Sequence, residues 1–175
     1  PTLRTMTQAG GKLQPELHRK MAQWCQQTGR QFIVMYGQCE ATARMGYLPW
    51  EHSLEKCGSM GVAIPGGRFE LIDADGSLIT APHVTGELRY YGPNVTMGYA
   101  QCAADLARGD ERGGVLETGD MAQVDEDGYY TIVGRKKRFL KLFGNRVNLD
   151  EVERMLKAAF PEGECACGGK DDHLV

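Results

Sequence analysis

The 175-residue chain has no long apolar run and no surplus of positive charge. No stretch approaches the length of a transmembrane helix, and no signal-peptide pattern opens the chain. The net charge of −3 gives no general attraction to nucleic acid or to an anionic membrane. We therefore expect a cytoplasmic protein that has no transmembrane segment and no nucleic-acid partner.

The chain also has no paired cysteine motif. Its six cysteines include no C-x-x-C pair, so neither a disulfide framework nor a zinc site is indicated. Reduced thiols are expected. Cys165 and Cys167 alternate on a predicted strand over residues 164–167, which favours a packing role over metal binding.

Glycine is abundant, at 23 residues, and indicates many tight turns. A helix is predicted over residues 15–27, where Leu17, Met21, Trp24 and Cys25 recur at helical spacing, with strands over residues 3–7 and 32–36 on either side. Short runs separated by turn residues predict a β-rich, barrel-like or sandwich-like unit. Its strands are expected over residues 61–64, 68–72, 85–91, 121–124 and 129–133.

A polar connector, Lys136-Lys137-Arg138, follows this unit. An amphipathic helix over residues 149–156, capped near Asn148 or Asp150 and ended by Pro161, comes next. The overall class is α/β, and α+β within this segment. We expect three parts: residues 1–57 end a large sheet domain, residues 58–136 form the β-rich subdomain, and residues 137–175 begin a small α+β domain.

The predicted hairpin over residues 121–133 places two opposite charges together. If it turns between Glu126 and Asp127, Asp120 lies roughly opposite Val133, so Asp120 and Arg135 emerge at the same end. A carboxylate can accept two hydrogen bonds from a sugar diol, and a guanidinium can bridge sugar and phosphate oxygens. An ordinary surface pair at a hairpin mouth is the alternative.

The segment Tyr36-Gly37-Gln38-Cys39-Glu40 follows a predicted buried strand. Ligands of α/β sheets tend to lie beyond the carboxyl ends of strands. An aromatic ring there can stack on a base, Gly37 allows close approach to phosphate, and Glu40 could bind Mg²⁺, which prefers oxygen ligands. The segment alone does not decide between this role and an ordinary loop.

Other motifs indicate less. Gly10-Gly11-Lys12 lacks the flanking residues of a phosphate-binding Walker loop and by itself is a turn. The stretches 73–76 and 125–128 begin like calcium loops but lack the later ligands, so hairpin turns are expected. The basic run from Arg135 to Lys141 favours a solvated linker over nucleic-acid contact.

Taken in order, these segments resemble the AMP-forming adenylating enzymes, a superfamily of acyl-CoA synthetases, peptide-synthetase adenylation domains and luciferases. The resemblance covers nearly the whole chain, because several motifs recur in the family's order. They are Gly10-Gly11, Tyr36 to Glu40, Gly58 to Gly66, Gly86-Glu87-Leu88 with Gly92-Pro93 and Gly98-Tyr99, Thr118-Gly119-Asp120, Gly134-Arg135, Gly144 to Val147, and Glu151-Val152-Glu153.

The resemblance implies a role for each matching residue. Tyr36 would stack on adenine, Glu40 would hold Mg²⁺, and Asp120 would accept both ribose hydroxyls. Arg135 would contact ribose and phosphate, and Arg146 the α-phosphate. The implied catalytic set is Glu40, Arg135, Arg146 and the hinge residue Lys137. The implied nucleotide-binding set is Gly10, Gly11, Lys12, Tyr36, Gly37, Gln38, Cys39, Asp120, Ile132, Arg135 and Gly144.

The implied chemistry has two steps. A carboxylic acid attacks the α-phosphorus of ATP to give acyl-AMP and pyrophosphate, and the thiol of coenzyme A then displaces AMP. A carrier-protein thiol is the alternative acceptor. Cys39 stands where the family's usual Thr would donate to phosphate, and Ala63 where Pro is common. Lys137 replaces the frequent Asp.

The chain opens without Met and stops early in an expected strand. By resemblance, its phosphate loop and its adenylating lysine are missing. We therefore expect a fragment of an acyl-CoA synthetase that is inactive in adenylation by itself.

Overall fold

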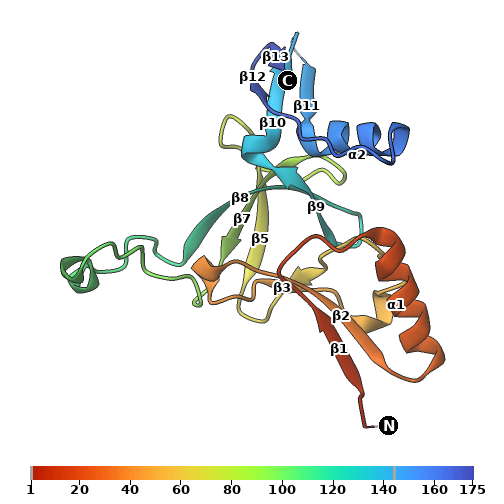
Figure 1. Cartoon of the computed structure of the whole chain (residues 1–175). Helices are drawn as coiled ribbons and strands as arrows, with labels where there is room; N and C mark the ends of the chain where they lie inside the picture. Colours follow the sequence, from red (N-terminus) through yellow and green to blue (C-terminus); the bar gives the residue numbers. More distant parts are fainter. Residues whose placement is uncertain (1, 144) are drawn as a thin grey trace.

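The computed structural model describes residues 2–143 and 145–175. The chain begins with a strand, helix and strand that form a parallel β-α-β unit (Figure 1). Two short strands extend this sheet antiparallel, giving the order β1-β2-β3-β4. The elements are β1 (Thr5–Gln8), α1 (Pro15–Gln27), β2 (Gln31–Tyr36), η1 (Cys39–Ala41), β3 (Gly46–Tyr47), η2 (Trp50–His52) and β4 (Val62–Ala63).

Helix α1 has the predicted bounds. Pro15 lies in its first turn, where no amide donor is needed. The inward face differs from the spacing that predicted the helix. His18, Ala22 and Cys25 are buried, whereas Leu17 and Trp24 lie largely exposed.

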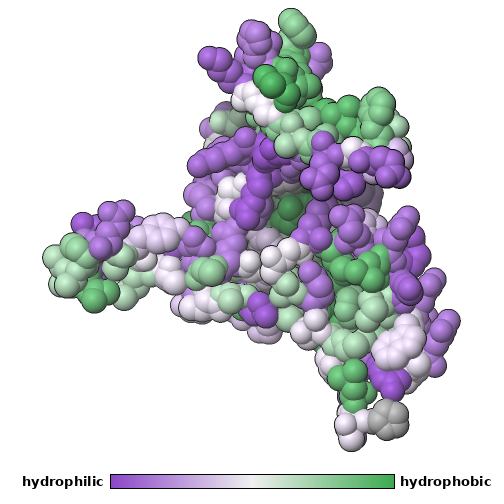
Figure 2. All heavy atoms as spheres, in the orientation of Figure 1, coloured by the Kyte–Doolittle hydropathy of each residue, from purple (hydrophilic) through white to green (hydrophobic). Residues whose placement is uncertain are grey.

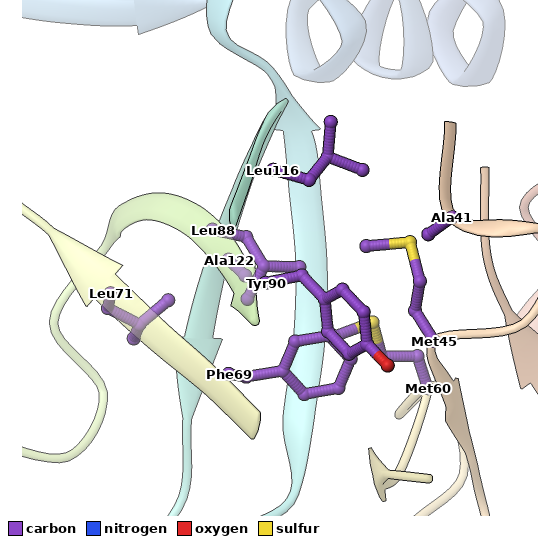
Figure 3. Packing of buried hydrophobic residues seen from close by; sticks show 9 residues of the cluster. All are labelled: Ala41, Met45, Met60, Phe69, Leu71, Leu88, Tyr90, Leu116 and Ala122. Carbon is purple, nitrogen blue, oxygen red and sulfur yellow. The ribbon is translucent and has the colours of Figure 1, made fainter. Parts of the chain in front are cut away.

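The β-rich part is an open antiparallel sheet of five strands in the order β6-β5-β7-β8-β9, which corrects the expected barrel-like shape. One face of this sheet packs against the first sheet around Phe69, Leu88 and Tyr90, with Met45 and Met60 from the other side (Figure 3). The five strands are β5 (Arg68–Ile72), β6 (Leu78–Ile79), β7 (Gly86–Tyr91), β8 (Val115–Val124) and β9 (Tyr130–Arg135).

The two acidic turns are hairpin turns, as predicted. Asp73 joins β5 to β6, and its amide donates to the Ser77 carbonyl. Asp125 joins β8 to β9 in the same way through Tyr129. Between β7 and β8 the chain instead extends as a long arm that contains η3 (Ala103–Ala107) and projects from the body in Figure 1.

A C-terminal lobe sits above the sheets in Figure 1 and follows the short helix η4 (Lys136–Arg138). Asn148 caps α2 by accepting a hydrogen bond from the Asp150 amide at 3.0 Å, as expected of a cap residue. The predicted strand over residues 164–167 is wrong, because this segment has no strand pairing. The lobe contains β10 (Phe139–Leu142), β11 (Asn145–Asn148), α2 (Leu149–Ala159), β12 (Gly169–Lys170) and β13 (His173–Leu174).

All six cysteines are free thiols. Cys167 is buried against Leu140 and Leu149, while Cys165 is exposed, so the two do not share a face of a strand. None of the helices in the described residues combines the length and the hydrophobicity of a membrane span.

Candidate nucleotide site

Asp120 and Arg135 lie opposite each other on β8 and β9, at the same end of the hairpin as predicted. The predicted partner, Val133, is wrong by two positions. The strands pair about a centre at Asp127, and a bulge between Met121 and Ala122 adds one further residue to β9. The bulge brings Arg135 Nε to 3.0 Å from Asp120 Oδ1.

Three donors hold the Asp120 carboxylate: Arg135 on the paired strand, and Tyr36 and Gln38 from a distant part of the chain. The Tyr36 hydroxyl donates to Oδ2 at 2.6 Å, and the Gln38 side-chain amide donates to the same oxygen at 2.9 Å. The Asp120 side chain is only 6% exposed, whereas that of Arg135 is 60% exposed. A buried anion fixed in this way is pre-organised to accept hydrogen bonds from a ligand.

Tyr36 keeps its proton. Burial, and then the neighbouring charge of Asp120, raise the pKa of its phenol well above the ordinary value. The hydroxyl therefore acts as a donor to Asp120. Its ring lies edge-on to Phe69, with centroids 6.2 Å apart. Whether this ring also stacks on adenine stays a prediction.

A cavity of about 430 Å³ opens beside Asp120. Figure 2 shows a hollow on a mainly hydrophilic face, between the C-terminal lobe and the β1–α1–β2 unit. The walls come from the loop after β1, the end of β2, the β8–β9 hairpin and Asp150 of α2. Predicted residues that line it are Gly10, Gly11, Lys12, Tyr36, Gly37, Gln38, Asp120, Ile132 and Arg135.

Sequence reasoning missed His18 in this wall. Its Nδ1 accepts a hydrogen bond from the Gly58 amide at 3.1 Å, and its Nε2 lies 3.0 Å from Ser53 Oγ. This pattern fits a neutral ring with its proton on Nε2. Burial, the first cause, lowers the pKa of His18, and the charge of Arg19 acts in the same direction. The available signal was the spacing of His18, Ala22 and Cys25, which places them on one helical face.

Glu40 lies on η1, outside the cavity wall, and Cys39 beside it is exposed. The Tyr99 hydroxyl donates to Glu40 Oε1 and is the main cause of the lowered pKa of this carboxyl. Within the described chain no group of three or more His, Cys, Asp or Glu side chains could hold a metal ion. A metal at Glu40 would therefore need ligands from a nucleotide or from water, which Mg²⁺ commonly uses.

The remaining predicted residues lie in η4 and in the C-terminal lobe. Lys137 lies in η4, and Arg146 pairs with Lys141 between β11 and β10. The Arg146 side chain and Gly144 lie outside what the structure describes. Neither the contact of Arg146 with a phosphate nor the contact of Gly144 with a nucleotide is tested by this geometry.

Comparison with known proteins points to one enzyme family. The model of the AMP-binding enzyme family matches residues 1–100. The chain is 34% identical over 146 residues to a long-chain-fatty-acid–CoA ligase of Salmonella typhimurium, covering 83% of this chain and 25% of that protein. It is 30% identical over 171 residues to a 2-succinylbenzoate–CoA ligase of Geobacillus sp., covering 98% of this chain and 33% of that protein.

The fold comparison agrees with these matches. O-succinylbenzoate coenzyme A synthetase (MenE) from Bacillus subtilis, in complex with ATP and magnesium ion, superposes with a TM-score of 0.75 and 26% identity. The match covers 98% of this chain and 35% of that one. The chain thus spans a quarter to a third of the curated relatives named above. Motif order, fold and family match lead to one conclusion: the chain belongs to the AMP-binding enzyme family.

Proposed function

We propose that this chain carries the AMP-binding part of an acyl-CoA synthetase. The observation that carries the proposal is the buried Asp120 carboxylate, paired with Arg135 at the wall of a 430 Å³ cavity. Asp120 would accept the two ribose hydroxyls of AMP. Arg135, with a largely exposed guanidinium, would bridge ribose and phosphate oxygens.

The base would lie between the Gly10-Gly11-Lys12 loop and Tyr36. The loop glycines present only backbone to the cavity, and a Cβ at either would meet no atom within 4 Å, so there is open space above them. A planar ring fits such a slot with few side-chain clashes. Lys12 at the rim adds a positive charge for an anionic group.

Mg²⁺ fits the residues at the phosphate end. Glu40 is a single, partly buried carboxylate on a tight turn, and Mg²⁺ is commonly held by one or two carboxylates together with phosphates. Bound there, the ion would neutralise charge on the transferring phosphoryl group. The chain's own part is to place the Glu40 carboxylate, which Tyr99 orients through its hydroxyl.

The proposed reaction of the whole protein has two steps, and the names of the relatives support it. A carboxylate oxygen bonds to the α-phosphorus of ATP as the bond to pyrophosphate breaks, which yields acyl-AMP. The sulfur of coenzyme A then bonds to the acyl carbon, AMP leaves, and the thiol proton passes to solvent. Asp120 and Arg135 hold the nucleotide through both steps by orientation and charge.

We also propose that the lobe beyond η4 turns about Lys137. Lys136 pairs with Glu87 of β7, whereas Arg138 pairs with Asp150 and Glu153 of α2. The side chains on either side of Lys137 are therefore tied to different parts of the molecule. Glu87→Ala should speed tryptic cleavage in η4, while Glu117→Ala, which breaks a similar pair with Arg89, should not; equal rates would contradict the proposal.

A calorimetric titration with AMP tests the nucleotide site. We expect the chain to bind AMP and Asp120→Ala to abolish binding, because the diol acceptor is lost. Asp75→Ala is the matched control, since Asp75 is an exposed carboxylate in the β5–β6 turn. Asp120→Asn keeps the side-chain shape, and urea denaturation checks that each variant without affinity is still folded. Equal affinity of Asp120→Asn and wild type, or no binding by the wild type at millimolar AMP, would overturn the proposal for this chain.

A further inference from the structure

A strained turn follows the Tyr36–Glu40 segment. Thr42 and Ala43 both have left-handed backbone angles, with φ of 48° and 68°. Glycine occupies this region freely, but a residue with a side chain, and a β-branched one above all, is strained there. Strained residues persist only where the surrounding structure holds them, and they cluster at functional sites.

The Thr42–Ala43 turn packs directly against the backbone of the Tyr36–Gln38 segment. The Ala43 amide donates to the Gln38 carbonyl at 3.1 Å, and the Met45 amide donates to the Tyr36 carbonyl at 2.9 Å. A Cβ at Gly37 would come within 2.3 Å of the Ala43 carbonyl oxygen. Gly37 is therefore required by the turn itself. The position of the turn also sets that of Gln38, which reaches Asp120.

Asn94 spans the strained pair from the outside. Its side-chain amide donates to the carbonyls of Ala41 and Arg44, each at 2.7 Å. These two residues flank Thr42 and Ala43. The Thr42 hydroxyl in turn donates to the Asn94 carbonyl at 3.3 Å. With two acceptors on one side, only the amide nitrogen of Asn94 can face them, so its orientation is fixed.

The other end of Asn94 is anchored in the core. The Tyr90 hydroxyl donates to Asn94 Oδ1 at 2.8 Å. Tyr90 is fully buried, and Figure 3 shows its ring beside Phe69 with the hydroxyl directed toward the segment of Ala41 and Met45. A rigid ring thus fixes the Asn94 side chain, and Asn94 fixes the turn.

We infer that Asn94 is a positioning residue of the nucleotide site, which clamps the Thr42–Ala43 turn and thereby places Gly37 and Gln38. Asn94 does not line the cavity, so it acts through these residues. The inference rests on the proposed function for its effect on AMP, whereas the clamp itself can be measured without a ligand.

Hydrogen exchange on the unliganded chain tests the clamp. In Asn94→Ala the amides of Ala43 and Met45 should exchange about tenfold faster, because local opening no longer breaks the Asn94 bonds. The control is Gln123→Ala on β8, which removes a 2.7 Å side-chain amide bond to Thr85. It should leave both amides as in wild type.

If Asn94 acts by holding the strained turn, a second substitution that relieves the strain should rescue Asn94→Ala. No such rescue is expected if Asn94 only adds general stability. Glycine at Ala43 takes a positive φ without penalty. Asn94→Ala should weaken AMP binding about tenfold, and Asn94→Ala combined with Ala43→Gly should recover most of the affinity and of the local protection. Ala43→Gly alone should bind AMP as wild type does.

Three results would overturn the inference. The first is wild-type exchange at Ala43 and Met45 in Asn94→Ala. The second is uniform acceleration across the five-stranded sheet, which would mean a global loss of stability. The third is unchanged AMP affinity despite faster local exchange. If the wild-type chain binds no AMP, the proposed function fails, and the exchange data still decide the clamp.

Discussion

The two ends of the candidate site are built differently. At the Asp120 end, a buried carboxylate receives hydrogen bonds from β2, from the loop after it and from β9. At the Glu40 end, a partly buried carboxylate sits on a short turn and takes its orientation from Tyr99, itself 66% exposed. The first end is held by burial, and the second is held from outside by the segment that carries Asn94 and Tyr99.

This difference matters for function. Ribose is common to ATP, acyl-AMP and AMP, so a rigid acceptor for its hydroxyls suits every step of the proposed reaction. The Glu40 end would hold the β- and γ-phosphates of ATP in the first step, and these phosphates are absent in the second. A carboxylate on a turn held by outside contacts can adjust to these states more easily than a buried one.

The largest expected contrast is in stability. Asp120→Asn should lower the free energy of unfolding by about 3 kcal/mol, because Arg135 loses its buried partner and two donors lose a charged acceptor. Glu40→Gln should change it by less than about 0.5 kcal/mol, because its carboxylate is more exposed than that of Asp120. Urea denaturation of the two variants measures both values. Similar losses for the two would contradict the contrast.

A second contrast is in pH dependence. The neutral ring of His18 is favoured in the folded state, since its pKa is lowered. Its contribution is therefore present above the ordinary value of 6.5 and is lost as the pH falls from 6.5 through the lowered pKa. The pKa of the Glu40 carboxyl is lowered from its ordinary value of 4.5. Its contribution to the free energy of unfolding is therefore present above pH 4.5 and is lost only at lower pH.

Unfolding measured at pH 7.5 and pH 5.5 separates these groups. Between the two values the wild type should lose up to about 1 kcal/mol, the size of the Gly58–His18 hydrogen bond. His18→Gln, which does not titrate, should lose less. His52→Gln is the control, because that ring is half exposed and contacts Glu55 and Tyr129 rather than Gly58. An identical pH response of His18→Gln and wild type would mean that His18 does not contribute to the pH dependence of stability.

The smallest expected effect is that of Tyr99→Phe. Loss of the hydroxyl should move the pKa of Glu40 back toward its ordinary value, because the Tyr99 bond is the first cause of its lowering. Stability should change by less than about 0.5 kcal/mol. Carbon-detected NMR titration of the Glu40 carboxyl reports the shift. An unchanged titration would mean that Tyr99 does not set the state of Glu40.

Local sequence signals predicted much of the fold. Pro15 and the spacing of apolar residues gave the bounds of α1, and Asn148 marked the start of α2. The segment over residues 164–167 follows the helix and has two alternating cysteines, which is compatible with the predicted strand, but it pairs with no strand. Burial of Cys167 against Leu140 and Leu149 explains the apolar residue there, and a local pattern cannot distinguish the two arrangements.

The residues of the candidate site that belong to a sequence motif could be predicted. Those that reach the site through contacts between distant parts of the chain could not. Asp120 and Arg135 followed from hairpin geometry, although the bulge that sets their pairing left no signal. Asn94 contacts residues about fifty positions away, and His18 contacts Gly58 forty positions away. Such contacts depend on how the two sheets pack, which a periodicity in one segment does not report.

A crystal structure of the chain with AMP would locate the nucleotide. We expect the ribose hydroxyls within hydrogen-bond distance of the Asp120 carboxylate, with the phosphate near Arg135. AMP bound away from this cavity, or bound within it with the ribose away from Asp120, would contradict the assignment of the site.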